Sequence, residues 1–467
     1  MSASFKTFVL ASTAACCIAA NACAAPDLIA LGSLDSHGAD LSAETAGTLE
    51  NGLAGNRLGG IGSGFAYAGD NTYIAIPDRG PNAVPYNPRV DDTTSYIDRF
   101  QTLTLAFTPN PPGAALPYRV TPTLVGTTLL SSATPLVYGS GTAAGLVNGA
   151  PALNARHRTY YFTGRSDNFD PRVPSDSPAN GRLDPEGVRV SNDGKSVYIA
   201  DEYGPDIYRF DRATGRRVRS YVLPRNLAVA HPSAMGRRET ASNAQGRAGN
   251  QGIEGLAITP DGRMLVGILQ SHLIQDSRRS VRIVTIDIET GAAHEYAYRL
   301  SSASASVSDI VAVNSHRFLV DERDGKGLGN HDAATFKKLF LIDLRGARDV
   351  TAMRGNLAAY AVPKTGFLDI VGVLRAHGID PRDIPAKLEG LAFGPDLVVD
   401  GATRHTLIVT SDNDFLPTVP AAGHPEGVPN PTRFYVFGFD DADLPGFQPQ
   451  RIATPGNGMT TTTPSRR

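Results

Sequence analysis

Cysteine is nearly missing from this sequence of 467 residues, and the few copies present lie together. Cys16, Cys17 and Cys23 all fall within the first 24 residues. Disulfides, thiolate catalysis and cysteine-ligated zinc are therefore excluded from the rest of the chain. The fold must then depend on core burial, alone or together with a hard cation held by oxygen ligands.

The sequence also lacks a net charge of either sign, with 44 Lys+Arg against 46 Asp+Glu. No overall field therefore points to nucleic acid or to a membrane surface. The sequence contains no GxSxG, HExxH or GxxxxGK[ST] motif, and no GxGxxG that opens a helix. Chemistry based on charge must come from local clusters of side chains.

Long hydrophobic runs are absent as well, except for a short apolar segment near the N-terminus. Lys6 precedes an Ala-rich run that is too short for a comfortable membrane span, and Ala22-Cys23-Ala24 offers a cleavage site. We therefore predict a cleaved signal peptide over residues 1–24 and a periplasmic or secreted protein. Simple secretion is favoured over a lipoprotein anchor, because no cysteine has a leucine three residues before it.

Helical periodicity is rare in the remainder. One short helix is predicted within "TGFLDIVGVLRAHG" (365–378), with Thr365 as its cap and Gly378 after its end. Elsewhere, short apolar runs such as "SVYIAD", "RIVTIDI" and "RFYVFGF" lie between turn residues and read as strands. This pattern predicts an all-β domain over residues 25–452, followed by a disordered tail at 453–467.

A repeated unit organises these strands. "EGVRVSND", "EGLAITPD" and "EGLAFGPD" begin at residues 186, 254 and 389, each with an Asp seven residues after the Glu. Weaker copies begin at 63 and 309, and a second strand follows each turn. The long gap after residue 63 leaves room for a further unit. We therefore predict a β-propeller, most simply with six blades and with five or seven as alternatives, interrupted by long loops at 163–184 and 224–252.

Propeller geometry brings the polar ends of these hairpins together. The first strand of a blade starts, and the second ends, at the same mouth of the central channel. Carboxylates gathered there need a counter-charge, which a divalent cation or interleaved arginines could supply. The all-oxygen set of ligands favours Ca²⁺. A single Glu-Gly could equally be solvated or bonded to backbone amides, whereas three copies in one register favour a functional role.

Taken together, "NRLGGIGSGFAY", "DPEGVRVSNDGKSVYIADEYGP", "IEGLAITPDGR", "VDERDG" and "KLEGLAF" resemble the bacterial family called phytase-like, or "esterase-like activity of phytase". The resemblance covers about residues 28 to 440. It implies a secreted or periplasmic propeller related to calcium-dependent propeller phosphatases and, more distantly, to propeller lactonases. It also implies hydrolysis of an ester or phosphoester. Ser63 and Asp309 depart from the repeated Glu, which argues against a symmetric ring of metal ligands.

We therefore predict a Ca²⁺-dependent hydrolase of small anionic phosphate esters, with no nucleic-acid partner. The predicted metal ligands are Glu186, Glu254, Asp309, Glu389 and Asp412. The predicted catalytic residues are Glu202 as general base, Arg79 and Arg323 as anion clamps, and Glu322. The predicted substrate-binding residues are Arg165, Asp78, Gln270 and Asn413. A carboxylic-ester hydrolase or lactonase, and a non-catalytic ligand-binding propeller, remain as alternatives.

Overall fold

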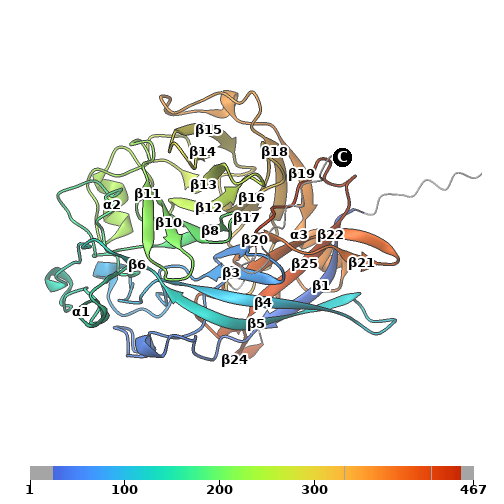
Figure 1. Cartoon of the computed structure of the whole chain (residues 1–467), viewed down its shortest axis with the longest axis horizontal. Coiled ribbons are helices and arrows are strands. Elements are labelled where there is room, and N and C mark those ends of the chain that lie inside the picture. Colours follow the sequence, from blue (N-terminus) through green and yellow to red (C-terminus); the bar gives the residue numbers. More distant parts are fainter. Residues whose placement is uncertain (1–24, 331, 422, 454–467) are drawn as a thin grey trace, which may run out of the picture.

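Four-stranded antiparallel sheets are the repeating unit of the fold. The computed structural model of the chain describes residues 25–330, 332–421 and 423–453. Within this part of the chain, five such sheets, or blades, surround a common centre (Figure 1). The predicted β-propeller is confirmed.

The first three blades follow one another along the chain, each with its strands in order from the centre outward. Blade 1 contains β2 (Gly64–Tyr67), β3 (Thr72–Ile76), β4 (Arg99–Pro109) and β5 (Tyr118–Leu129). Blade 2 contains β8 (Pro185–Val190), β9 (Ser196–Asp201), β10 (Asp206–Asp211) and β11 (Arg217–Tyr221). Blade 3 contains β12 (Ile253–Ile258), β13 (Met264–His272), β14 (Ser280–Asp287) and β15 (Ala293–Arg299).

The last two blades are blade 4 and blade 5, and blade 5 joins the two ends of the domain. Blade 4 contains β16 (Ser306–Ala312), β17 (Arg317–Arg323), β18 (Lys337–Asp343) and β19 (Lys364–Asp369). Blade 5 contains β20 (Leu388–Phe393), β22 (Ala402–Ser411), β25 (Thr432–Phe439) and β1 (Asp27–Leu34). Its outermost strand therefore comes from the start of the domain. β1 also pairs in parallel with β5, so blades 1 and 5 are continuous.

The remaining elements are short and lie in the connections. The small strands are β6 (Ser131–Ser132), β7 (Tyr160–Tyr161), β21 (Leu397–Val399), β23 (Thr418–Ala421) and β24 (His424–Pro429). The α-helices are α1 (Leu153–His157), α2 (Gly236–Ser242) and α3 (Ile370–Ala376). Single 3₁₀ turns occupy Ala43–Thr45, Pro88–Val90, Thr142–Ala144 and Ala358–Tyr360.

The preferred count of six blades was wrong. The expected extra unit between residues 63 and 186 does not form a blade. Long outer strands of 11 and 12 residues, β4 and β5, take up part of this segment. The irregular stretch that holds β6, α1 and β7 takes up most of the rest. Five repeats in the sequence thus correspond to five inner strands.

The expected single helix is α3, which is one of three short α-helices in the described residues and is shorter than the 365–378 pattern. Residues 364–369 form β19 instead, and the Asp369 side chain, rather than that of Thr365, caps the helix by accepting from Gly372 N–H. Pairing with β18 therefore outweighs helical periodicity over the first part of that pattern. Gly378 follows the helix with a φ of +79°, as expected for a residue after a helix C-terminus.

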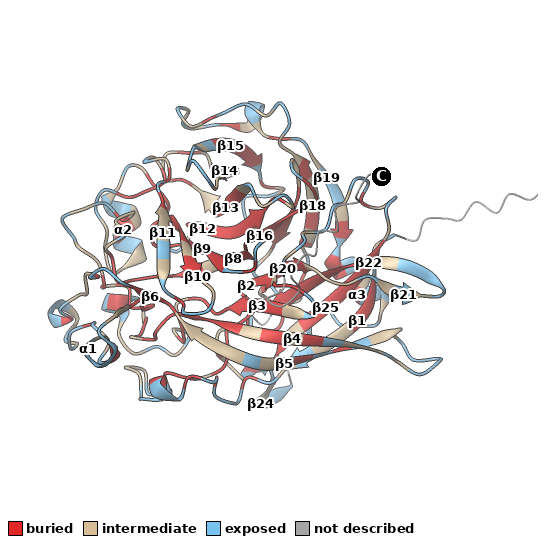
Figure 2. Ribbon diagram, in the orientation of Figure 1, coloured by how far each residue is buried: buried red, intermediate tan, exposed pale blue. Residues whose placement is uncertain are grey.

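The inner strands contact each other in the cyclic order β2, β8, β12, β16, β20. The glycine after each repeated Glu permits this approach. A Cβ on Gly187 would lie 2.6 Å from Leu256 N, and one on Gly255 would lie 2.7 Å from Asp309 Cα. Figure 2 shows buried residues concentrated on the strands around the centre, with exposure increasing toward the outer strands and loops. The motif therefore serves packing between blades as well as the placement of a Glu.

One ion pair ties all five inner strands together at the centre. Arg189 of β8 donates to both carboxylate oxygens of Asp309 of β16, at 3.2 and 3.0 Å, and to the Phe65 carbonyl of β2. The Asp309 carboxylate also accepts from Leu256 N of β12 and Leu391 N of β20. Both side chains are buried, at 4% and 1% exposure. The pair therefore lies across the channel.

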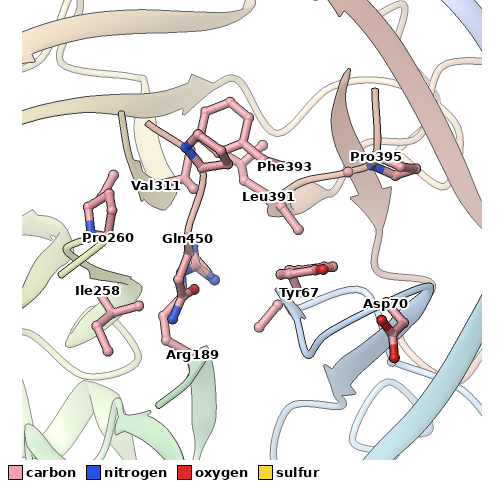
Figure 3. Close-up of a pocket in the computed structure, with 15 residues that line it drawn as sticks. Tyr67, Asp70, Arg189, Ile258, Pro260, Val311, Leu391, Phe393, Pro395 and Gln450 are labelled. Atoms are coloured by element: carbon pink, nitrogen blue, oxygen red, sulfur yellow. The ribbon is translucent and has the colours of Figure 1, made fainter. Parts of the chain in front are cut away.

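Two cavities lie at opposite ends of the inner strands. A small one of about 130 Å³ is lined by Arg189 and by apolar side chains such as Val311, Leu391 and Phe393 near the strand ends (Figure 3). A larger polar cavity lies at the strand starts. No helix among the described residues is both long and apolar enough to cross a membrane. The predicted signal segment and, apart from residue 453, the predicted tail lie outside the described residues.

Candidate functional site

The larger cavity has a volume of about 400 Å³ and is lined mainly by polar side chains. Its walls come from the starts of β8, β12 and β20, the ends of β3, β17 and β22, and the loops around residues 250, 328 and 416. The predicted site residues among its lining are Asp78, Arg79, Glu186, Glu254, Gln270, Arg323, Glu389, Asp412 and Asn413. Hairpin geometry thus brings most of the predicted site to one mouth.

A β-bulge lies at the Glu-Gly position of three inner strands. The register shifts between Pro185 and Val188, between Ile253 and Gly255, and between Leu388 and Leu391. A bulge inserts an extra residue and re-aims a side chain out of the regular alternation. The bulges therefore explain how the three inner strands β8, β12 and β20 each present a Glu to the same cavity.

The first acidic group, which we name the Glu186 cluster, consists of Asp184, Glu186 and Glu202. One oxygen of each carboxylate lies within 4.8 Å of the others. Asp184 accepts from the Arg79 backbone N–H at 3.2 Å and forms an ion pair with its guanidinium. Glu202 Oε1 accepts from Gly252 N–H at 3.1 Å, whereas the buried Oε2 accepts no hydrogen bond. The cluster thus has one arginine for three carboxylates.

Glu254 adds a fourth acid beside this cluster. Gln270 donates to Glu254 Oε1 at 2.7 Å, while the buried Oε2 accepts no hydrogen bond. Burial, together with the charge of Glu389, raises the pKa of Glu254 to about 8. Burial and the charge of Glu254 also hold the pKa values of Glu186 and Glu202 well above their usual range. These carboxylates are therefore short of positive charge.

The second acidic group, the Asp412 cluster, consists of Asp78, Asp412 and Asp414, again with one oxygen of each within 4.8 Å of the others. Lys387 Nζ forms ion pairs with Asp412 and, at 2.8 Å, with Asp414. Burial favours the neutral form of Lys387, but these two carboxylates hold the pKa of Lys387 well above its usual value. Burial favours the protonated form of Asp414, but Lys387 lowers the pKa of Asp414 below its usual value. This cluster thus contains its own cation.

Asp78 connects the two clusters. Burial raises its pKa to about 7, against the opposing effect of Lys387, and the charge of Asp184 adds to the rise. On the far wall, Arg323 pairs with Glu389 and donates from Nε to Ser308 Oγ at 2.6 Å. The cavity therefore combines two groups of carboxylates with three cationic side chains, each of which already has an acidic partner.

Several predicted residues lie elsewhere. Asp309 was expected to hold a metal, but both of its oxygens are used by Arg189 and by backbone amides. Glu322 lies between blades 3 and 4, where it accepts from Tyr298 and from the Ser301 backbone N–H. Glu322 and Arg323 are adjacent in a strand, so their side chains point to opposite faces.

Arg165 also lies outside the lining of the larger cavity. Its fully buried guanidinium pairs with Asp167 at 2.6 Å and donates to the Val147 carbonyl at 2.8 Å. Arg165 therefore holds together separate segments of the long connection between blades 1 and 2. Glu202, the predicted base, is only 1% exposed and lies beside Glu186 rather than in the lining.

The residues that the sequence analysis did not assign to the site are Lys387, Asp414, Asn82, Asn250 and Asp184, of which all but Asp184 line the cavity. Lys387 could have been found, because it stands two residues before Glu389 in "KLEG" and alternate residues of a strand share a face. Asn82 and Asn250 belong to irregular loops, where no periodicity indicates a direction.

Fold and cavity together define a class of protein, a five-bladed β-propeller with an acid-lined cavity at one mouth. Residues 56–415 match the Phytase-like family, described as "Esterase-like activity of phytase". The chain belongs to this family, as the sequence motifs predicted.

The chain is also similar to a curated protein and, at lower identity, to solved structures. A protein of Arthroderma benhamiae, described as an uncharacterized secreted protein, is 27% identical over 449 residues. The match covers 78% of this chain and 84% of that protein. The periplasmic gluconolactonase of Pseudomonas aeruginosa is 10% identical, with a TM-score of 0.32, over 80% of this chain and 88% of that one. Hydrazine synthase of Kuenenia stuttgartiensis is 13% identical, with a TM-score of 0.32, over 76% and 78%. We draw nothing about activity from these two structural similarities.

Proposed function

We propose that this protein is a secreted hydrolase of small anionic phosphate esters that depends on a divalent cation, Ca²⁺ in the first instance. The observation that supports the proposal most strongly is the Glu186 cluster with Glu254 beside it. Carboxylates removed from solvent and left without enough positive charge are costly unless an external cation joins them. The cavity mouth provides the route by which such an ion would arrive.

The available ligands suit calcium. Every candidate donor is a carboxylate or amide oxygen, and none of the described lining residues is His or Cys. Ca²⁺ prefers six to eight oxygen ligands, some of them water, whereas zinc prefers nitrogen and sulfur. Asp184 already carries Arg79, so we assign the ion to Glu186 and Glu202. When bound, such an ion would polarise an ester oxygen and lower the pKa of a coordinated water.

The side chains of the cavity suit the remaining parts of a hydrolysis. Glu254 replaces Glu202 as our candidate general base, because Glu254 lines the cavity with one oxygen held by Gln270 and the other unpaired. It would take a proton from the water that attacks phosphorus, while the P–O ester bond breaks and the leaving alkoxide takes a proton from solvent. Arg79, Arg323 and Lys387 would orient the anionic oxygens.

The experiment combines ion binding with turnover. Calcium binding of the purified protein is measured by calorimetry, and hydrolysis of p-nitrophenyl phosphate, bis-p-nitrophenyl phosphate, p-nitrophenyl acetate and a γ-lactone is followed with calcium or with chelator. We expect phosphate release that chelator abolishes. Glu254→Gln should lower turnover by about 10² to 10⁴-fold and leave calcium affinity within a few-fold of wild type.

The exposed Glu289→Gln is the matched control and should change neither quantity. Phosphate release that chelator leaves intact would refute the proposal, and wild-type turnover by Glu254→Gln would remove Glu254 from the mechanism. Tight ion binding without turnover on any substrate would favour a non-catalytic binding propeller.

A second candidate, hydrolysis of a carboxylic ester or lactone, is favoured by one observation. Arg79, Arg323 and Lys387 are each already paired with a carboxylate, so little positive charge is left for a dianionic phosphate. A neutral ester would need only the ion and the base. Turnover of the acetate or the lactone without phosphate release would support this second function.

A further inference from the structure

The ammonium group of Lys387 occupies the centre of the Asp412 cluster. Nζ bonds to Asp412 and Asp414, and it lies 3.6 Å from Glu389 Oε2. That Glu389 oxygen is buried and accepts no hydrogen bond. The ammonium therefore faces carboxylates from both sides, from the residues after β22 and from the start of β20.

The backbone fixes this position. Lys387 directly precedes β20, and its carbonyl accepts the Asp412 N–H at 3.1 Å. The lysine and the aspartate are thus held at adjacent points of the same strand pair, with Asp412 only 4% exposed. A long flexible side chain held this closely behaves as a fixed charge.

The Asp412 and Glu186 clusters each contain three carboxylates, with one oxygen of each carboxylate within 4.8 Å of the others. They differ in what neutralises them. The Asp412 cluster receives an ammonium that bonds to two of its three acids. In the Glu186 cluster, Arg79 bonds to Asp184 and approaches Glu202 Oε2 no closer than 3.9 Å.

We infer that Lys387 takes the place of a second divalent cation, so that the protein binds one ion, at the Glu186 cluster. The inference rests on the proposed function for the identity of that ion site. It predicts that replacing the ammonium by a neutral side chain leaves Asp412 and Asp414 without their counter-charge, beside Asp78 and the unpaired Oε2 of Glu389. Those oxygens would then bind a second divalent ion, because oxygen ligands of this kind suit calcium.

The test is the calcium stoichiometry of the full chain, by calorimetry and by equilibrium dialysis with metal analysis, for wild type, Lys387→Met and Lys387→Arg. We expect one ion for wild type, two for Lys387→Met and one for Lys387→Arg, which keeps the charge. Circular dichroism and thermal unfolding report whether each variant folds. Lys387→Gln, which keeps a polar end, serves if Lys387→Met does not fold.

The outcomes separate this inference from the proposed function. Two ions in wild type would overturn the role of Lys387 and leave the proposed function standing. One ion in a folded Lys387→Met or Lys387→Gln would do the same. No ion in wild type would refute the proposed function, and a gain of one ion in Lys387→Met would then still support the role of Lys387.

Discussion

The Glu186 and Asp412 clusters border one cavity, contain three carboxylates each, and differ in their counter-charge. Lys387 offsets the Asp412 cluster from within the chain. The Glu186 cluster has Arg79 on one member and an unpaired oxygen on another. The number of acids therefore does not indicate where an external cation is needed. The placement of lysine and arginine around them does.

Other buried acids of the protein extend the comparison. Asp309 is paired with Arg189 and with backbone amides, although burial still raises its pKa to about 6. Asp321 is fully buried, and neither of its oxygens accepts a hydrogen bond. Burial raises its pKa to about 8, although Arg323 and Lys337 oppose the rise. A buried carboxylate here is thus balanced by a side chain, by a proton or, in our proposal, by an ion from solution.

The largest effect is expected at Asp309. Asp309→Asn leaves Arg189 buried beside a neutral amide, and breaking a buried ion pair in this way costs about 3–5 kcal/mol. The free energy of unfolding, measured by denaturant titration, should fall by that amount, while calcium affinity stays unchanged. The exposed Asp441→Asn should change stability by less than about 0.5 kcal/mol. A loss of calcium affinity without a loss of stability would restore Asp309 as a metal ligand.

The next effect concerns ion binding at the two clusters. Glu186→Gln should weaken calcium binding by at least about 100-fold, since even residues that support metal ligands are worth about 10 to 100-fold. Asp414→Asn removes an acid from the cluster that Lys387 already neutralises, so its effect should stay within about threefold. Calorimetry on both variants measures the difference. Equal losses would mean that the two clusters share one ion.

The smallest effect is a pH dependence of stability due to Asp321. Because the folded-state pKa, about 8, lies above the usual value of 3.8, the fold favours the protonated form. Its stabilising contribution is complete below about pH 4 and is lost as the pH rises through 8. From pH 6 to pH 8, wild type should therefore lose about 2 kcal/mol of stability relative to Asp321→Asn. Parallel stability curves for the two proteins would contradict the protonated state.

Sequence reasoning went furthest where the chain repeats itself. Three Glu-Gly copies in one register identified the inner strands and placed Glu186, Glu254 and Glu389 at a shared mouth. Sequence reasoning failed where the direction of one side chain decides whether that residue reaches the cavity. Alternation along β17 sends Arg323 into the cavity and Glu322 away from it, and the sequence alone does not say which of two neighbours faces inward.

The predicted number of blades was wrong for a related reason. The gap between two repeats shows how many residues intervene but not which structure they form. The segment after residue 76 supplies the long outer strands of blade 1 instead of starting a new sheet. Asp309 shows the same limit in another form. An acid at the repeated position can accept hydrogen bonds from the neighbouring backbone as readily as it can bind a ligand. At Asp309, the position of Arg189 across the ring of inner strands decides between these two roles.

The Arg189–Asp309 pair has a consequence for the movement of small molecules through the central channel of the propeller. Because the pair crosses the channel between the two cavities, a molecule in the acidic cavity has no path along the channel to the opposite mouth. In the hydrolysis that we propose, the incoming ester and the departing alcohol and phosphate would therefore share the opening at the acidic mouth, and bound product would delay the next substrate molecule. Accumulated product would therefore compete directly with substrate for entry.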